Sequence, residues 1–232
     1  MVKRLLSFCL VVLILPVLLG ELGQSGNAQN DATAGYNALV NTVRIVHNSP
    51  YKSHFGVSSA DVVAGSGVLL DNGMVLSCYN LLSGYEAGEI VIQRFNGATV
   101  EVRQGTQVIL VAWDKKSDLL LLQVMPPFHG SGVKVAAQKP KFGERIMLTG
   151  HPQLSLTKLR LYQYLEGSLG IMITPVFFGD SGGGVFNSNG ELIGNIKMIL
   201  SIQSPLPQNT LYGYATPLDA IREFLNERPR RN

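Results

Sequence analysis

The chain has 232 residues, enough for one large domain or two small fused ones. Its hydrophobic share of 46% suits a domain with a sizeable core, and its net charge of +3 is spread too thinly for a nucleic-acid-binding surface. None of the four histidines has a spacing that suggests a metal pair, and we expect neither a metal nor a cofactor.

The first segment has the composition of an export signal. Lys3 and Arg4 precede an apolar run from Leu5 to Gly20, and the small residues SGNA end at Ala28. A basic start followed by an apolar core is typical of a cleaved secretory signal, although the run is almost long enough for a retained membrane anchor. We expect residues 1–28 to be one or the other, and the chain to be secreted or periplasmic, with this segment as its only contact with a membrane.

Three further regions follow the signal. Residues 29–35 read as a polar linker, 36–228 as the folded domain and 229–232 as a basic, solvated tail. Within the domain, Asp71-Asn72-Gly73, Asn96-Gly97 and Asn189-Gly190 separate short runs rich in β-branched residues, which is a strong hairpin signal. The pattern predicts about twelve strands at the spacing of a β-sandwich or barrel.

One helix is well signalled, at the end of the domain. Thr216 provides an N-cap, Pro217 suits the first helical position and Asp219 is an acid near the start. Apolar residues then recur at helical spacing, and Arg228 and Pro229 end the helix. The recurring apolar residues are Leu218, Ile221, Phe224 and Leu225.

The stretch GDSGGG, residues 179–184, presents Ser181 between glycines. A serine is a weak nucleophile until a neighbouring base takes its proton. The stretch matches G-x-S-x-G, but a nucleophile elbow needs a helix directly after the serine, and three glycines start a helix poorly. A tight loop between strands fits better, since its glycines let backbone N–H groups converge as an oxyanion hole. A glycine-rich hairpin with no function is the alternative.

The same stretch resembles the nucleophile loop of trypsin-like serine proteases, closer to the exported HtrA/Deg type than to digestive trypsins. GSGVLLDNGMVLSCYNLLSG resembles the stretch leading to that family's histidine, SDLLLLQV its aspartate strand and LTGHP its turn. LIGNI and GYATPLDAIREFL resemble its closing strands and helix. The match runs from about Tyr36 to Leu225. It implies an all-β, chymotrypsin-like fold of two antiparallel six-stranded β-barrels with a cleft between them, followed by the C-terminal α-helix.

The resemblance also implies roles for individual residues. Ser181 takes the nucleophile position and Asp118 that of the orienting acid, while the backbone N–H groups of Gly179 and Ser181 take the oxyanion-hole positions. The histidine position falls on Asn80, in V-L-S-C-Y-N-L-L. An asparagine side chain donates and accepts hydrogen bonds but takes up no proton at neutral pH, so Asn80 could hold the geometry without acting as the base. Loss of a key triad member costs about 10⁴ to 10⁶ in rate, and we expect very weak peptidase activity or none.

No other histidine is an obvious substitute. His47 lies on the predicted first strand, His129 between strands and His151 in the turn that resembles LTGHP. His54 follows the first strand and is the least constrained of the four, so it is the one that could fold over the cleft. Cys78, the one cysteine beyond the signal, cannot form an internal disulfide and is expected to be a small buried residue.

Two departures from the family bear on regulation. Many HtrA-type proteins have asparagine before the serine, whereas this chain has Asp180, as trypsins do. Trypsins pair that acid with a new N-terminus freed by cleavage. Arg44-Ile45-Val46 resembles such a cleavage site weakly, but it lies in ALVNTVRIVHN, which favours a first strand. No PDZ-like domain follows, so we expect no regulation by one.

Apolar residues surround the serine in the sequence. If they line the first specificity pocket, that pocket is apolar and binds by burial alone, although the same residues could simply fill the core. They are Val176, Phe177, Met198, Ile199 and Leu200.

Three functions remain open on these residues. The chain could be a serine endopeptidase with an impaired triad, acting on peptide or unfolded protein. It could be a pseudoprotease that captures extended polypeptide by strand addition without cutting it. It could also be a structural or inhibitory partner with a vestigial site.

Overall fold

The computed structural model describes residues 25–48, 62–82, 90–96, 99–101, 107–125, 127–128, 132–151, 158–173, 175–201, 211–227 and 230–231. Residues 1–24 lie outside the described part of the chain, as do His54 and His129, so only the last four residues of the predicted export segment 1–28 are described, and these are helical. Within the described ranges no helix has both the length and the apolar character needed to cross a membrane.

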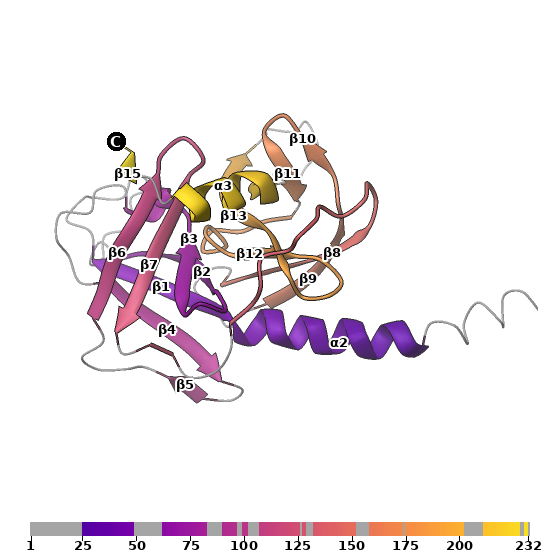
Figure 1. Cartoon of the computed structure of the whole chain (residues 1–232), viewed down its shortest axis with the longest axis horizontal. Coiled ribbons are helices and arrows are strands. Elements are labelled where there is room, and N and C mark those ends of the chain that lie inside the picture. Colours follow the sequence, from indigo (N-terminus) through magenta and orange to yellow (C-terminus); the bar gives the residue numbers. More distant parts are fainter. Residues whose placement is uncertain are drawn as a thin grey trace, which may run out of the picture.

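Two curled β-sheets build the molecule and lie next to one another (Figure 1). The first has the strand order β15-β6-β7-β3-β2-β1-β4-β5 and is antiparallel except where β15 joins β6. Its strands are β1 (Thr42–Asn48), β2 (Val62–Leu69), β3 (Met74–Ser77), β4 (Ile90–Asn96), β5 (Thr99–Glu101), β6 (Gln107–Asp114), β7 (Leu119–Met125) and β15 (Arg230–Arg231).

The second sheet is antiparallel throughout its described pairs and has the order β10-β11-β14-β13-β12-β8-β9. Its strands are β8 (Arg145–Gly150), β9 (Lys158–Gln163), β10 (Glu166–Gly167), β11 (Gly170–Ile173), β12 (Gly184–Phe186), β13 (Leu192–Ser201) and β14 (Leu211–Pro217). The predicted chymotrypsin-like architecture is confirmed, although the described strands number eight and seven rather than six in each half.

Two of the three predicted hairpin turns are found where the sequence placed them, while Gly97 of the third, Asn96-Gly97, lies outside the described residues. Asp71-Asn72-Gly73 joins β2 to β3, with Gly73 at a φ of 80° and the Met74 N–H donating to Asn72 Oδ1 at 3.0 Å. Asn189-Gly190 joins β12 to β13, with Gly190 at a φ of 76°. Both glycines adopt the left-handed conformation that makes glycine the usual residue at such positions.

The core is divided by β7, which is buried on both faces. Leu119 and Leu121 belong to one apolar cluster, which also contains residues of both helices and both sheets. Leu120 and Leu122 point the other way, into a cluster made by the first sheet. Successive side chains of a strand alternate between its faces, so a run of four leucines suits a strand with core on either side. This burial fixes the start of β7, directly after Asp118.

Helix α2 (Ser25–Val40) precedes the first strand; in Figure 1 it runs below the second sheet and ends near the junction of the two sheets. Residues 29–35, which we predicted to be a linker, are therefore helical. The helix packs through Ala34 and Ala38, both buried in the shared core cluster. It carries no strong apolar stripe, which explains why the sequence pattern did not reveal it.

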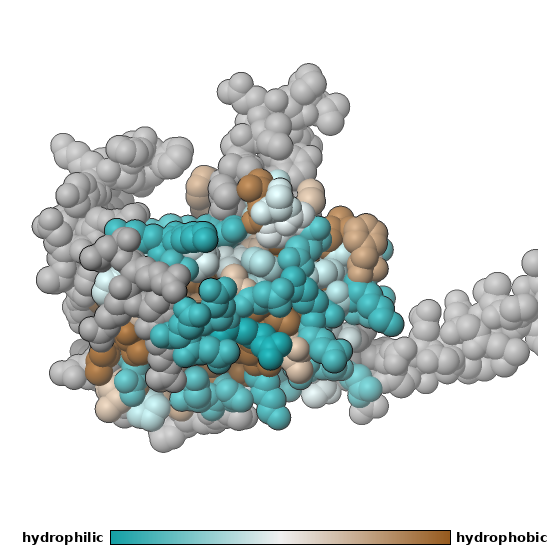
Figure 2. Space-filling model, turned by 45° about the horizontal axis from the view of Figure 1, so that its top comes forward, coloured by the Kyte–Doolittle hydropathy of each residue, from teal (hydrophilic) through white to brown (hydrophobic). Residues whose placement is uncertain are grey.

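Helix α3 (Leu218–Glu227) confirms the predicted C-terminal helix, which begins directly after Pro217. It buries Leu218, Ile221 and Phe224 and lies between the upper parts of the two sheets in Figure 1. Seen with the top of that view turned forward, the described surface is mostly hydrophilic with small apolar areas between (Figure 2). The tail differs from the prediction, because Arg230 and Arg231 pair with Trp113 and Asp114 of β6.

Candidate active site

Ser181 lies on the loop between β11 and β12, with its side chain partly exposed. Gly179 and Gly182 on either side have φ values of 96° and 83°, which favour glycine. A Cβ at Gly182 would lie 2.0 Å from the Ser66 carbonyl oxygen. Because β12 begins at Gly184, no helix follows the serine, and the loop is not a nucleophile elbow.

Asp118 ends the turn between β6 and β7 with a φ of 55°, the only positive value among the described residues other than glycine. Aspartate tolerates this conformation better than most residues. Asp114 fixes the turn, since its carboxylate accepts hydrogen bonds from the Lys116 N–H at 3.0 Å and the Ser117 hydroxyl at 2.6 Å. The Asp118 carboxylate is thereby held against the residues that follow β3.

Burial makes the Asp118 carboxyl group a weaker acid than an ordinary aspartate. It raises the pKa of Asp118 to about 6, while hydrogen bonds from Asn80 and the positive charge of Lys197 limit the rise. The Asp118 carboxyl group therefore titrates at weakly acidic pH, close to the range in which an ordinary histidine titrates.

Asn80 belongs to the short 3-10 helix η1 (Tyr79–Leu82). Its backbone N–H donates to Asp118 Oδ1 at 2.7 Å, and its Nδ2 donates to Asp118 Oδ2 at 3.0 Å and to the Lys197 carbonyl at 2.7 Å. Its Oδ1 accepts from the Cys78 thiol at 3.0 Å. Both hydrogens of the side-chain amide are therefore donated to groups other than Ser181.

Ser66 of β2 joins the first sheet to the serine loop, and sequence analysis did not single it out. Its N–H donates to the Ser181 carbonyl at 2.7 Å, and its hydroxyl donates to the Gly179 carbonyl at 2.7 Å and accepts from the His151 N–H at 2.9 Å. The residue is fully buried. The sequence clue to a close approach here is the glycine on each side of Ser66. In the structure a Cβ at Gly65 would lie 2.8 Å from the Ser181 carbonyl oxygen, so the serine loop packs directly against β2.

Two further hydrogen bonds join the sheets at this point. The Asn80 side chain, which follows β3 of the first sheet, donates to the Lys197 carbonyl of β13 in the second sheet. The Thr216 hydroxyl at the end of β14 donates to the Ser117 carbonyl at 2.6 Å. The residues predicted as nucleophile, orienting acid and histidine replacement thus lie where the sheets meet, Asn80 and Asp118 on one side and Ser181 on the other. Their catalytic roles remain predictions.

The segment before the serine forms a type II turn. The Asp180 N–H donates to the Phe177 carbonyl at 3.0 Å, and Gly179 has the positive φ that this turn requires at its third residue. Among the described groups, none accepts a hydrogen bond from the N–H of Gly179 or of Ser181. Unpaired backbone donors of this kind are what an oxyanion hole needs, so the geometry is compatible with the predicted role.

The predicted pocket is only partly described, and its role stays a prediction. Val176 is fully buried in the core of the second sheet and offers no surface to a ligand. Phe177 is partly exposed. The backbone of Met198–Leu200 runs in β13, and the side chains of these residues lie outside the description. A cavity of about 250 Å³ opens elsewhere in the second sheet, lined by Tyr162, Gln163, Leu165, Met172, Ile173, Gly213 and Tyr214.

Within the described residues, no histidine is placed where it could take the proton of Ser181 in place of residue 80. His151 is fully buried, and the position of the His47 side chain is outside the description. Because residues 49–61 are also outside it, the interpretation of His54 stays a prediction. No group of three or more His, Cys, Asp or Glu side chains suited to a metal ion occurs in the part of the chain that the structure describes.

One strand edge beside this site lacks a partner among the described strands. β12 pairs with β13 only as far as Asn195, whereas β14 follows β13 to Ser201 on its other side. The register of the β13–β14 pair shifts between Ile196 and Met198, and such a bulge redirects the strand. Among the described strands, the backbone of Met198–Ser201 therefore has no partner on this side, next to Lys197, whose carbonyl accepts from Asn80.

Comparison with known proteins identifies the protein family. A family model described as the trypsin-like peptidase domain matches residues 65–194, which is more than half of the chain. The chain therefore belongs to the trypsin-like peptidase family. No curated protein gives a significant sequence match.

Solved structures share the fold at low sequence identity. A serine endoprotease from Yersinia pestis is 20% identical with a TM-score of 0.65, over 85% of this chain and 65% of that protein, so this chain spans slightly less than two thirds of its length. The active form of the Rv3671c protease from M. tuberculosis is 17% identical with a TM-score of 0.63, covering 86% of this chain and 85% of that one. An inactive serine-to-alanine mutant of Rv3671c is 16% identical with a TM-score of 0.59, covering 84% and 89%.

Proposed function

We propose that this chain is an exported member of the trypsin-like peptidase family that binds extended polypeptide beside Ser181 and hydrolyses it very weakly or not at all. The observation that carries the proposal is the bonding of Asn80. Its amide donates both hydrogens to Asp118 and Lys197, and an amide has no basic nitrogen. Acyl transfer to a serine needs a base that takes the hydroxyl proton and later returns it to the leaving amine.

The arrangement keeps the supporting parts of a protease site, while position 80 has no group that can act as a base. Asp118 retains a hydrogen-bonded partner at position 80, so the orienting contact is preserved. The Ser181 hydroxyl has no acceptor among the described side chains. Residual reactivity from binding and from the backbone donors would remain, at the low level expected when a triad member is lost.

Polypeptide capture is supported by the strand edge and the backbone donors. The edge of Met198–Ser201 that has no partner among the described strands suits an added strand, since an extended peptide can make main-chain hydrogen bonds to it. The N–H groups of Gly179 and Ser181, which have no acceptor among the described groups, can donate to a peptide carbonyl at the end of such a strand. Export is supported by the basic start and apolar run of residues 3–20.

The first test compares the full-length native chain with Asn80→His, Asn80→Gln and Ser181→Ala. Each is assayed for cleavage of unfolded casein and for labelling by a fluorophosphonate, which reacts with an activated serine. We expect the native chain to be silent, and Asn80→His to gain activity because an imidazole can accept the proton. Asn80→Gln is the matched control, since it enlarges the amide without adding a base, and it should stay silent.

Two results would count against the proposal. Cleavage by the native chain that Ser181→Ala abolishes would mean that another base operates, and the protein would be an active endopeptidase. Failure of the native chain to bind unfolded casein, measured with the fluorescently labelled protein at increasing concentration, would remove the capture function. The double variant Asn80→His/Ser181→Ala is the control for the site, because a gain that persists in it would show that the new activity arises elsewhere.

A further inference from the structure

The acid before the serine carries a buried charge. Asp180 has no exposed surface, and its Oδ1 lies 2.8 Å from Nη2 of Arg160, whose side chain is 16% exposed. Its Oδ2 accepts a hydrogen bond from the Phe177 N–H at 2.8 Å. A carboxylate removed from water in this way needs a counter-ion, and breaking such a pair leaves an uncompensated charge.

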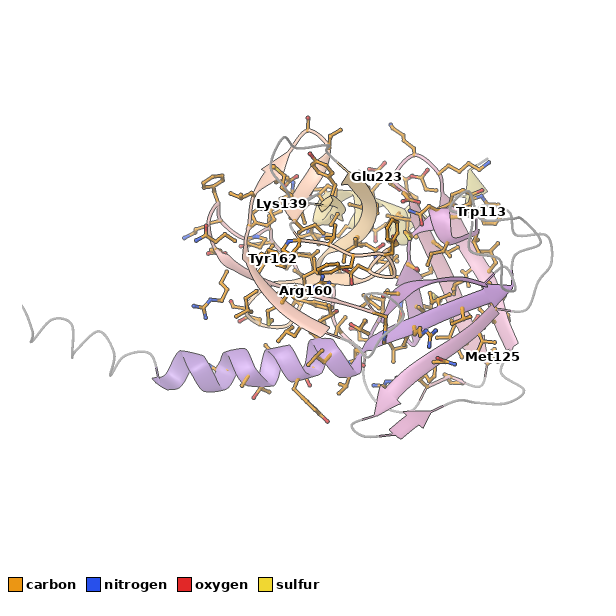
Figure 3. The ribbon with its side chains drawn as sticks, turned by 180° about the vertical axis from the view of Figure 1, so that it is seen from behind. Trp113, Met125, Lys139, Arg160, Tyr162 and Glu223 are labelled. Carbon is orange, nitrogen blue, oxygen red and sulfur yellow. The ribbon has the colours of Figure 1, made fainter. Side chains whose placement is uncertain are left out.

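Arg160 does more than neutralise this acid. From its position on β9, Nη1 donates to the Pro175 carbonyl at 3.4 Å, and the guanidinium carbon lies 5.5 Å from the centre of the Phe177 ring. The next inward-facing residue of the strand, Tyr162, donates from its hydroxyl to the same Pro175 carbonyl at 2.6 Å. Arg160 and Tyr162 lie near one another in the half of the molecule formed by the second sheet (Figure 3).

These contacts hold the segment that shapes the serine loop. Arg160 touches it at Pro175, Phe177 and Asp180, and the Asp180 carboxylate closes back on the Phe177 N–H. A planar guanidinium with several fixed donors suits such a task better than an ammonium group. Gly150 of β8 leaves room for the acid, since a Cβ there would lie 2.4 Å from Asp180 Oδ1. Arg160 and the Asp180 carboxylate therefore hold the type II turn at Gly179 from its buried side.

A freed N-terminus is not needed for this purpose. The Arg44-Ile45-Val46 stretch that resembles an activation site lies in β1, which is paired with β2 on one side and with β4 on the other. Cleavage after Arg44 would cut the middle of a sheet. The buried acid that such a terminus would reach is already paired with Arg160.

We propose that Arg160 is a positioning residue that replaces the freed N-terminus, keeping the Gly179 and Ser181 N–H groups ready to bind an anionic or carbonyl oxygen without any activating cleavage. The proposal deepens the proposed function, because it rests on Ser181 and its turn being the binding site. It predicts that recognition of a tetrahedral, oxyanion-bearing ligand depends on Arg160 far more than recognition of a plain peptide does.

The test uses two ligands with the full-length native chain, Arg160→Met and Arg160→Lys. One ligand is a peptide boronic acid, whose boron bonds the serine oxygen, releases the hydroxyl proton to solvent and becomes a tetrahedral anion. The other is the same peptide ending in an amide. We expect Arg160→Met to weaken boronate binding by about 10²-fold, the loss typical of an oxyanion donor, with peptide-amide binding changed less than about twofold. Arg160→Lys should restore part of the boronate affinity.

The control variant is Arg145→Met, which removes an exposed arginine at the far end of β8 from Gly150 and should alter neither affinity. Mass spectrometry of the native chain bound to boronate should show β1 uncut. Equal losses for both ligands, no loss in Arg160→Met, or binding only after cleavage near Arg44 would each overturn the proposal.

A second measurement separates this proposal from the proposed function. If the native chain binds neither ligand, the proposed function fails, and Arg160 is then judged by crystal structures of the native chain and Arg160→Met. We expect Gly179 to leave its positive φ and the bond from the Asp180 N–H to the Phe177 carbonyl to be lost in the variant. An unchanged turn in Arg160→Met would refute the assignment.

Discussion

Asn80 and Asp118 are joined twice, by the backbone N–H to Oδ1 at 2.7 Å and by the side-chain amide to Oδ2 at 3.0 Å. The paired contact occupies both oxygens of the acid. It gives the site the outline of a family triad while placing a group that takes no proton where the base would be. The same buried surroundings raise the pKa of the Asp118 carboxyl group.

We predict that Asp118 lowers the stability of the chain as the pH rises through weakly acidic values. Burial raises the pKa of Asp118 to about 6 from the ordinary value of 3.8. Between these values the folded chain holds the proton more tightly than the unfolded chain. The free energy of unfolding contributed by this group is therefore highest below about pH 4 and is lost as the pH rises through about 6.

Asp118→Asn tests this, because the variant has no titrating group there. Urea unfolding of both chains between pH 4 and pH 8 should show the native chain losing stability relative to the variant from about pH 4 to about pH 6, with a constant difference above that. A difference that stays flat across the range, or that changes with the opposite sign, would contradict the prediction.

Ser66 is predicted to be the costliest serine to remove from the junction of the sheets. Ser66→Ala leaves the Gly179 carbonyl and the His151 N–H without their partner, both at a fully buried position. We expect a loss of about 2–4 kcal/mol in the free energy of unfolding. Ser77→Ala is the matched control, because the Ser77 hydroxyl donates to the Ser66 carbonyl at 2.7 Å but does not join the sheet to the serine loop, and its loss should cost about 1–2 kcal/mol. Equal losses in urea unfolding would show that the Ser66 bridge is unimportant.

Local sequence signals predicted much of this molecule. The turns at Gly73 and Gly190 and the start of α3 depend on a few adjacent residues whose conformations are restricted, and the structure has them where expected. Alternating apolar residues likewise predicted strands in a β fold. The placement of Asn80 beside Asp118 followed from the family resemblance, not from local pattern.

The contacts that no local pattern reveals are those between distant segments. Arg160 is one of two cations in the strand KLRLYQ, and only the fold brings it to Asp180. Val176 reads as a pocket residue beside the serine but turns into the core. Helix α2 was missed because it is held by two small residues, Ala34 and Ala38, rather than by an apolar stripe.

Cys78 is predicted to be unreactive in the folded chain. Burial raises the pKa of its thiol well above the ordinary value, and the negative charge of Asp118 adds to the rise. The thiolate is the reactive form, so alkylation requires opening of the fold. In a Cys9→Ser background, iodoacetamide at pH 8 should modify Cys78 about 10²-fold more slowly in buffer than in concentrated urea, followed by intact mass. Similar rates in the two conditions would show that the thiol is accessible in the native state.

Gly182 and Gly73 provide a matched pair for the serine loop. Their φ values are 83° and 80°, so alanine is strained by backbone conformation to a similar degree at both. The surroundings differ, since a Cβ at Gly182 would lie 2.0 Å from the Ser66 carbonyl oxygen, whereas nothing lies within 4 Å of one at Gly73. We expect Gly73→Ala to lower the free energy of unfolding by about 1 kcal/mol and Gly182→Ala by about 4 kcal/mol or more, measured by urea unfolding. A Gly182→Ala variant as stable as Gly73→Ala would mean that β2 does not hold the serine loop as closely as this contact requires.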